Sequence, residues 1–495
     1  MRLRFAALPG WVRFIVFCAV GGIAGLGQAP IDLWPATILA LAFMLFMHPT
    51  SRSPRQSAFH VWSFGLGYFA FTLRWIVEPF LIDAGRYGWM APFALALMAA
   101  GAALFWAGFA YAADRALPRS TLALGLALCW AELTRSLVFT GFPWALLGHI
   151  WVPTPWAQLA AYGGPHLLTL VTVMTAWAVM ALISGTRMMG GAILIAILLL
   201  APLLRPAAAV DNSGPIVRLV QPNAPQDQKW DPDHSAFFLN RLVALTGQGA
   251  VPDLVVWPET SVPYLLNYVQ SDLSLLSDAA RGAPLVFGIQ RRDDAFRYYN
   301  SLVVMGQGGI IQSVYDKRHL VPFGEYVPFG DMLSRWGVHG LATTDGAGFA
   351  GGQSAGPVQL PGIGGAVPLI CYEGIFAEEI DSGDGERPRL LLLITNDAWF
   401  GEAAGPYQHL AQARLRAIEQ GLPMVRVANT GISAMIDPQG RIVAALALNT
   451  SGTLDVALPA ARPVTFYARM GEWPHAVLLI LLTTMGYLAL RRRSD

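Results

Sequence analysis

Long apolar stretches with few charged positions dominate the first 210 residues of the chain. A helix needs roughly 20 mostly apolar residues to cross a bilayer, with a range of ~17–25. Seven such segments follow one another here, and an eighth lies near the other end of the sequence. They cover residues 12–29, 33–48, 58–77, 89–113, 120–139, 157–184, 189–204 and 474–490. The pattern predicts an integral membrane helical bundle of about eight transmembrane helices.

Between residues 211 and 465 the apolar runs are shorter and punctuated by turn residues. Runs of five to eight apolar residues predict buried strands, and the period of residues 407–421 predicts a helix. The predicted strands cover 215–222, 253–259, 283–290, 301–307, 309–317, 365–373, 389–399 and 424–431, before a hairpin-like pair around 437–440. This alternation is typical of a layered α/β domain. We therefore expect a helical bundle over 1–210, an α/β domain over 211–465, and a final membrane helix with an Arg-rich tail over 466–495.

Composition agrees with this division. Of the 495 residues, 13% are charged, about half the ~25% of an average soluble protein. Residues 1–210 hold only 17 charged side chains, against 48 in the remaining 285. A net charge of +1 gives no electrostatic case for a nucleic-acid partner, and three cysteines cannot form a disulfide framework.

Arginine placement predicts the orientation of the spans, because cytoplasmic connections are enriched in basic residues. Alternate connections of the bundle carry the arginines. These are Arg2, Arg4, Arg13, Arg52, Arg55, Arg115, Arg119, Arg187, Arg491, Arg492 and Arg493. We expect both termini in the cytoplasm and, in a bacterium, residues 205–473 in the periplasm next to the inner membrane. The first segment is expected to remain as an uncleaved anchor.

Glu132 and Arg135 lie three residues apart on the fifth segment, and ionisable groups at this depth are costly unless they are paired or functional. An ion pair that fixes the helix end and a functional role are both open. The following stretch, 141–144, breaks the helix and could re-enter the membrane.

A Gly-rich stretch, 337–357, has no apolar period and is expected to be a mobile loop. It contains a formal GxGxxG pattern at 346–351, but that fingerprint needs a strand before it and a helix after it. The chain has no P-loop, HExxH or CxxC motif. We therefore expect no metal and no nucleotide cofactor.

Cys371 is the only cysteine of the predicted α/β domain, and it ends the apolar run AVPLI. An idle exposed thiol would be oxidised in the periplasm, so a buried inert cysteine and a nucleophile remain as alternatives. Only two of the 33 basic residues are lysines, Lys229 and Lys317. An ammonium is a compact charge with a tunable pKa, which Arg cannot replace.

Glu259 ends the run LVVWPE, so Glu259, Lys317 and Cys371 each follow a predicted strand. These three types suit acyl transfer. A thiolate attacks a carbonyl, a carboxylate takes its proton, and an ammonium stabilises the oxyanion, keeps the Glu ionised and favours the thiolate.

These residues resemble the Glu–Lys–Cys triad of the nitrilase superfamily, and their surroundings resemble its integral-membrane branch, the apolipoprotein N-acyltransferases. The similar stretches are 140–148 (TGFPWALLG), 221–230 (QPNAPQDQKW), 257–260 (WPET), 315–328 (YDKRHLVPFGEYVP), 370–376 (ICYEGIF), 396–409 (NDAWFGEAAGPYQH) and 428–433 (ANTGIS). One departure is 402–404, Glu-Ala-Ala, where the family pattern has a small hydroxyl residue.

The resemblance implies an α-β-β-α sandwich and a ping-pong acyl transfer through a thioester on Cys371. The donor would be the sn-1 chain of a phospholipid, typically phosphatidylethanolamine. The acceptor would be the free α-amino group of the diacylglyceryl-cysteine of an apolipoprotein. It also implies support of the Lys and Cys by Glu325 and Glu373, and a pocket shaped by Trp230 and Tyr372. A monomer with a lateral, lipid-accessible opening is expected.

Two other functions are compatible with parts of this pattern. A membrane-tethered amidohydrolase of the nitrilase type would use the same triad, but a soluble substrate needs no bundle of spans. A transporter with an outer binding domain would leave Cys371 and Lys317 structural. Against it, the spans have no visible repeat and few paired charges.

Overall fold

The structure is a computed structural model that describes residues 2–200, 204, 213–269, 272–328, 348–354, 356–380 and 385–491. The chain forms two compact units. The helical unit comprises Met1–Ala207, Ala403–Ala411 and Val464–Asp495, and the sheet unit comprises Ala208–Glu402 and Gln412–Pro463.

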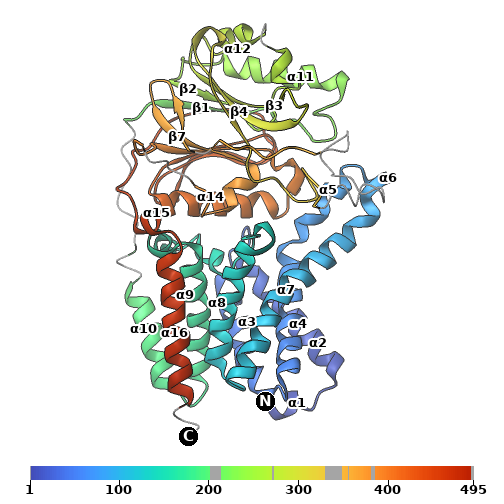
Figure 1. Ribbon diagram of the computed structural model, residues 1–495, viewed down its shortest axis with the longest axis vertical. Coiled ribbons are helices and arrows are strands. Elements are labelled where there is room, and N and C mark those ends of the chain that lie inside the picture. The colour runs from blue at the N-terminus through green and yellow to red at the C-terminus, as the bar shows by residue number, and fades with distance from the viewer. Residues whose placement is uncertain are drawn as a thin grey trace. The chain divides into compact units, whose positions relative to one another are not determined.

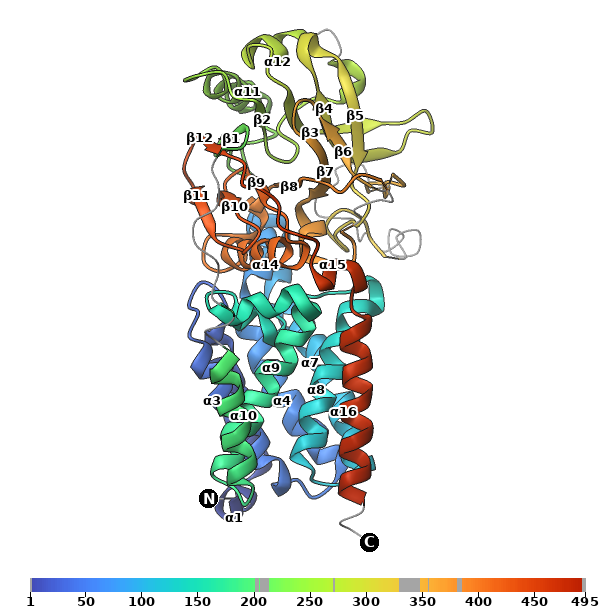
Figure 2. The ribbon, with the colours of Figure 1, turned by 90° about the vertical axis from the view of Figure 1, so that its left-hand side faces the viewer.

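Every apolar segment predicted to span the membrane coincides with a helix of the helical unit (Figures 1 and 2). These helices are α2 (Gly10–Ala24), α3 (Trp34–Met47), α4 (Pro54–Thr72), α7 (Ala91–Ala116), α8 (Thr121–Leu137), α9 (Ala160–Leu182), α10 (Arg187–Leu200) and α16 (Trp473–Arg491). The membrane helical part is therefore confirmed.

The lengths of the helices separate long candidate spans from shorter ones. Among the described residues, five helical stretches are long and apolar enough to cross a bilayer. They are Gly10–Gly27, Ala84–Ala116, Thr121–Thr140, Pro155–Leu182 and Trp473–Arg491. The α3 and α10 regions are shorter apolar helices. Residues 201–203 of the predicted segment 189–204 lie outside the described residues. The count of eight stays a prediction.

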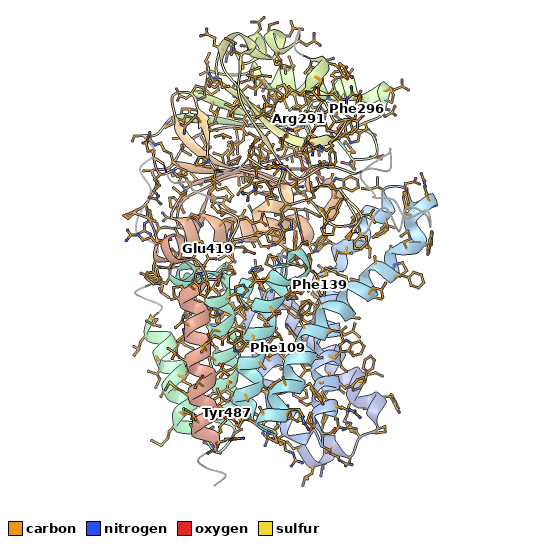
Figure 3. All side chains as sticks on the ribbon, viewed as in Figure 1. Phe109, Phe139, Arg291, Phe296, Glu419 and Tyr487 are labelled. Carbon is orange, nitrogen blue, oxygen red and sulfur yellow. The ribbon has the colours of Figure 1, made fainter. Side chains whose placement is uncertain are left out.

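Small residues set the close packing of the bundle. A Cβ on Gly21 of α2 would lie 1.9 Å from the Phe64 carbonyl oxygen, and one on Gly67 of α4 would lie 1.9 Å from that of Cys18. These two glycines let the α2 and α4 backbones touch. On another face, Phe109 and Tyr487 (Figure 3) help to line an apolar groove of about 170 Å³ between α7, α8 and α16.

Glu132 and Arg135 of α8 form a buried ion pair. Glu132 accepts hydrogen bonds from Trp106 Nε1 (2.8 Å) and from the Leu147 amide (3.1 Å). Arg135 donates to the Trp144 carbonyl (2.9 Å). The pair thus fixes both the end of α8 and the non-helical segment that follows it, which supports the structural alternative for these residues.

The sheet unit contains two six-stranded sheets. The first has the order β12-β1-β2-β3-β4-β5 and the second β11-β10-β9-β8-β7-β6. The first-sheet strands are β1 (Ile216–Gln221), β2 (Leu254–Val256), β3 (Leu285–Arg292), β4 (Tyr298–Met305), β5 (Ile311–Asp316) and β12 (Gly452–Ala457). The second-sheet strands are β6 (Val358–Leu360), β7 (Gly364–Ile370), β8 (Leu390–Thr395), β9 (Met424–Ala428), β10 (Ser433–Ile436) and β11 (Ile442–Leu446).

Helices cover the outer faces of the two sheets (Figures 1 and 2). Helices α11 (Pro232–Thr246) and α12 (Leu273–Ala279) lie over the first sheet. The part of α14 (Gly405–Gln420) that belongs to the sheet unit, residues 412–420, lies under the second. An apolar core that includes Trp257, Phe287 and Val303 joins the first sheet to its helices. The expected α-β-β-α sandwich is confirmed.

The Gly-rich stretch 337–357 is only partly described, because residues 337–347 and 355 lie outside the described residues. The described part is held by backbone hydrogen bonds. The Phe349 amide donates to the Glu325 carbonyl and the Gly352 amide to the Lys317 carbonyl, both at 2.8 Å. Two backbone hydrogen bonds thus link residues 349 and 352 to the segment that carries Lys317 and Glu325, and the mobility of the loop stays a prediction.

Candidate active site

The three predicted catalytic side chains each follow the carboxyl end of a strand in the sheet unit. Glu259 lies three residues after β2, Lys317 directly after β5, and Cys371 directly after β7. The first two come from one sheet and the third from the other. In each case the apolar run ends at the end of the strand. The polar residue that follows it therefore lies at the edge of the sheet where the strands end.

Glu259 and Lys317 lie close together in a buried carboxylate–ammonium cluster. Lys317 Nζ is 4.0 Å from Glu259 Oε1 and 2.8 Å from Glu325 Oε2, and its side chain is 1% exposed. Asn300 Nδ2, on β4, donates to Glu259 Oε1 at 2.7 Å and to Glu325 Oε1 at 3.2 Å. The amide thus spaces the two carboxylates around one ammonium.

The strand end that carries Lys317 is fixed by the neighbouring strands. Asp316 accepts hydrogen bonds from Arg291 Nε on β3 and from Ser301 Oγ on β4, both at 2.7 Å. Arg291 is labelled in Figure 3. The Lys317 amide donates to the Asn300 carbonyl (2.8 Å). Lys317 therefore leaves a braced strand rather than a free loop.

Cys371 occupies a strained turn. Its φ is +52°, in the left-handed region that non-Gly residues rarely adopt. The residue is 5% exposed, and its thiol forms a hydrogen bond with the Thr395 side chain. The charges of Glu259 and Lys317 both act on the pKa of this thiol, in opposite directions. A sharp turn at a strand end presents a nucleophile away from its own backbone.

Burial dominates the electrostatics of the site. Desolvation and the Glu259 charge raise the pKa of Cys371, although Lys317 acts in the opposite direction. Desolvation likewise raises the pKa of Glu259, against the effect of Lys317. Burial would lower the pKa of Lys317, but Glu325, Glu259 and Cys371 outweigh it and raise it. Burial thus favours the thiol form of Cys371, whereas the charge of Lys317 favours the thiolate, which is the direction expected for that residue.

Glu373 connects the segment of Lys317 to the segment of Cys371. Its Oε1 accepts hydrogen bonds from Tyr315 Oη (2.8 Å) and the Arg318 amide (2.7 Å), and its Oε2 accepts one from the Ile370 amide (2.7 Å). Tyr372 packs beside the same segment, with its ring centroid 5.4 Å from that of His319. The structure therefore places Glu325, Tyr372 and Glu373 in contact with the elements that carry the Lys and Cys.

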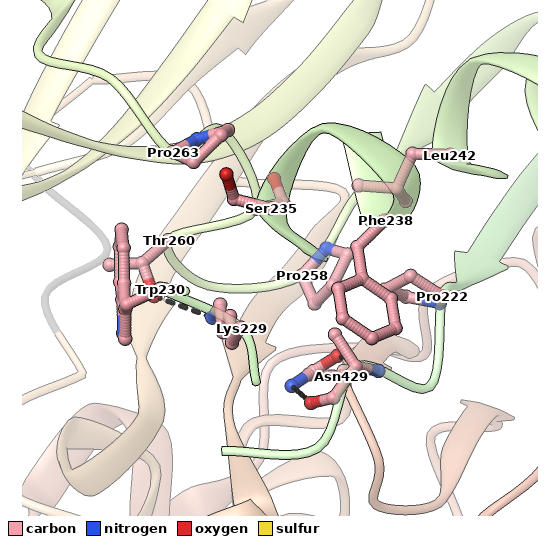
Figure 4. A pocket seen from close by; sticks show the side chains of 12 residues that line it. Pro222, Lys229, Trp230, Ser235, Phe238, Leu242, Pro258, Thr260, Pro263 and Asn429 are labelled. Atoms are coloured by element: carbon pink, nitrogen blue, oxygen red, sulfur yellow. Dashed lines mark hydrogen bonds between the residues drawn. The ribbon is translucent and has the colours of Figure 1, made fainter. Parts of the chain in front are cut away.

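Trp230 lies at a small cavity of the sheet unit (Figure 4). The cavity has a volume of about 10 Å³, room for about one water. Its lining includes Lys229, Thr260 and Asn429 beside the apolar Phe238 and Pro258. This cavity is too small for an acyl chain, so Trp230 borders a water-sized space here.

Two residues of this cluster were not singled out as site residues from the sequence. Asn300 was missed, although an amide inside the buried run YYNSLVV is a usable signal. Lys229 was noticed only for the scarcity of lysine, and it lies beside Glu259. Among the described residues, no group of three or more His, Cys, Asp and Glu could hold a metal ion.

Comparison with known proteins identifies both units. The family profile Carbon-nitrogen hydrolase matches residues 216–464, and the profile Apolipoprotein N-acyltransferase N-terminal domain matches residues 20–178. The chain is 37% identical to the apolipoprotein N-acyltransferase of Rhodopseudomonas palustris, over 98% of this chain and 96% of that protein. It belongs to the apolipoprotein N-acyltransferase family. The enzyme of the same name from Bradyrhizobium diazoefficiens is 38% identical, over 99% of this chain and 98% of that protein.

Among solved structures, an amidase from Nesterenkonia sp. is similar, at 20% identity, covering 55% of this chain and 99% of that chain with a TM-score of 0.37. Membership of the apolipoprotein N-acyltransferase family rests on the full-length relatives and favours a membrane acyltransferase over the amidohydrolase alternative. It likewise disfavours the transporter alternative.

Proposed function

We propose that this chain transfers the sn-1 acyl chain of a phospholipid to the α-amino group of a diacylglyceryl-cysteine at the N-terminus of an apolipoprotein. Glu259, Lys317 and Cys371 are the catalytic residues in this proposal. Trp230, Glu325, Tyr372 and Glu373 support them or border the substrate. The observation that carries it is the buried Glu259–Lys317 pair beside the thiol of Cys371, in a chain of this family.

In the first half-reaction, Glu259 takes the thiol proton as the sulfur attacks the ester carbonyl. The Lys317 ammonium stabilises the oxyanion. The ester C–O bond breaks, a C–S bond forms, and the proton passes from Glu259 to the departing lysophospholipid oxygen. In the second, the acceptor amine attacks the thioester carbonyl, Glu259 takes a proton from the nitrogen, and the thiolate leaves and is reprotonated.

The proposal includes the placement of the chain. Residues 1–210 and 466–495 form the membrane part, and 211–465 form the catalytic domain on the periplasmic side. Both termini are cytoplasmic, and the enzyme acts as a monomer without a nucleic-acid partner. The Arg-rich connections support this orientation, and two amphiphilic substrates suit a catalytic domain that is tethered to their membrane.

The decisive experiment is mass spectrometry of the full-length protein in detergent after incubation with phospholipid. We expect an acid-stable, thiol-labile fatty-acyl adduct on Cys371 that transfers to a diacylated lipopeptide. Cys371→Ser is the control and should carry no such adduct. No adduct in the wild type, or release of free fatty acid without transfer to the amine, would contradict the proposal.

A further inference from the structure

The second lysine of the chain lies at the same site as the first. Lys229 is buried, at 7% exposure. Its Nζ donates to the Glu259 carbonyl at 3.1 Å and to Thr260 Oγ1 at 2.8 Å. Figure 4 shows Lys229 pointing toward Thr260, with Trp230 alongside. Its two acceptors belong to the turn that carries the proposed general base.

This turn is strained and tightly enclosed. Thr260 has a φ of +45°, a left-handed backbone conformation that strains a β-branched residue. From the other side, the β3 backbone comes so close that a Cβ on Gly288 would lie 2.4 Å from the Thr260 nitrogen. Such a conformation persists only when surrounding contacts hold it, and Lys229 supplies two of them.

The chemistry of the contacts explains why this residue is a lysine. An ammonium is a point donor that can serve a carbonyl and a hydroxyl at once, whereas the planar fork of Arg needs more space and different acceptors. The neighbouring cavity of about 10 Å³ offers no such space. Apart from Lys229 and Lys317, all 31 basic residues of the chain are Arg.

Lys229 also brings a second positive charge to the cluster. Burial lowers the pKa of Lys229 to about 8, against the opposing effects of Glu259 and Cys371. The ammonium is therefore mostly protonated at neutral pH. Lys229 and Lys317 both lower the pKa of Glu259, which burial and Glu325 raise.

We infer that Lys229 is a positioning residue, whose ammonium fixes the Glu259–Thr260 turn so that the carboxylate faces Lys317 and Cys371. This inference rests on the proposed function. It assigns to Lys229 a role distinct from that of Lys317, because its bonded partners are the backbone and hydroxyl of the turn rather than the carboxylates.

The test measures single-turnover thioester formation on Cys371 in the full-length enzyme across pH. Removing the ammonium raises the pKa of Glu259, which must be ionised to act as a base. We therefore expect Lys229→Met to slow the step at least about tenfold and to move the acid limb of the pH profile upward. Lys229→Arg keeps the charge, so it should be slow with the acid limb near its wild-type position.

Thr260→Val keeps the shape of the turn but removes one acceptor. It should slow the step without moving the acid limb, and its effect should not add to that of Lys229→Met. Arg281→Met, which removes an exposed cation that donates to the Gly249 carbonyl, is the matched control and should match the wild type.

A Lys229→Met enzyme with the wild-type rate would overturn the inference, and so would a slow one with an unmoved acid limb. If Lys229→Met fails to fold, a wild-type rate in Thr260→Val would overturn it. Failure of the wild type itself to form the thioester would instead refute the proposed function.

Discussion

At the scale of single residues, burial acts against ionisation of both the Cys371 thiol and the Glu259 carboxyl group. Burial raises the pKa of both Cys371 and Glu259. In the proposed mechanism, Glu259 takes the thiol proton as the sulfur attacks the carbonyl, so neither group has to stay charged on its own. Lys317, which keeps its proton, supplies the fixed positive charge for that moment.

Changing either partner of Cys371 should therefore stop the chemistry without unfolding the protein. Gln at position 259 cannot accept the thiol proton, and Arg at position 317 cannot fit a side-chain site that is 1% exposed. We expect Glu259→Gln and Lys317→Arg each to lower acyl transfer by about 10²–10⁴-fold. Transfer assays and thermal melting would check this, and full activity of Lys317→Arg would refute the argument from lysine scarcity.

At the scale of elements, Glu373 acts as a bracket between β5 and β7. On the β5 side it accepts hydrogen bonds from the Tyr315 hydroxyl and from the Arg318 and His319 amides. On the β7 side it accepts one from the Ile370 amide. Its acceptors therefore set the distance between the segment of the ammonium and the segment of the thiol. Several donors on one buried carboxylate favour its charged form, against the burial that raises the pKa of Glu373.

Glu373→Gln should weaken this bracket more than removal of a single donor. The amide nitrogen of Gln would face an N–H group, which leaves a buried donor unpaired at a cost of about 1–3 kcal/mol. Tyr315→Phe removes one hydrogen bond and should cost about 1 kcal/mol. Melting temperature and the rate of thioester formation would be compared, and equal values for Glu373→Gln and wild type would contradict this role.

Sequence patterns predicted most elements because buried strands of this sheet unit are continuous apolar runs. Two strands were not predicted: β6 has only three residues, and β12 is half-exposed and has no clear apolar face. Strand pairing is invisible in the sequence, and it is the pairing of β4 with β3 and β5 that brings Asn300 to the site. The sequence therefore predicts the reactive residues at strand ends, such as Cys371. It does not predict which residues of neighbouring strands, such as Asn300, contact them.

At the scale of the whole molecule, the positions of the charged residues carry more information than the net charge of +1. The arginines of the helical unit lie mainly at its helix ends, and Figures 1 and 2 place the N-terminus and the end of α16 at the same end of this unit. This agrees with the proposed orientation, in which the Arg-rich end faces the cytoplasm.

Labelling of intact cells with a membrane-impermeant thiol reagent would test this orientation. Phe296 is 71% exposed in the sheet unit, so Phe296→Cys should react from outside. Arg119→Cys, between α7 and α8, should react only after the inner membrane is permeabilised. Both variants would carry Cys18→Ala and Cys129→Ala as background, and that background alone is the control. The reverse labelling pattern would overturn the proposed topology.

The pairing of β1 with β12 has a consequence for how such a chain can arise. Ile216 pairs with Ala457, and the Leu458 amide donates to the Pro215 carbonyl at 2.9 Å. Apart from residues 403–411, the sheet unit is thus one insertion between α10 and α16, and its first and last strands are paired with each other. Domains with adjacent ends tolerate insertion into a host chain. The sheet unit therefore has the end geometry of an inserted domain, because the β1–β12 pair holds together the two points where it joins the helices.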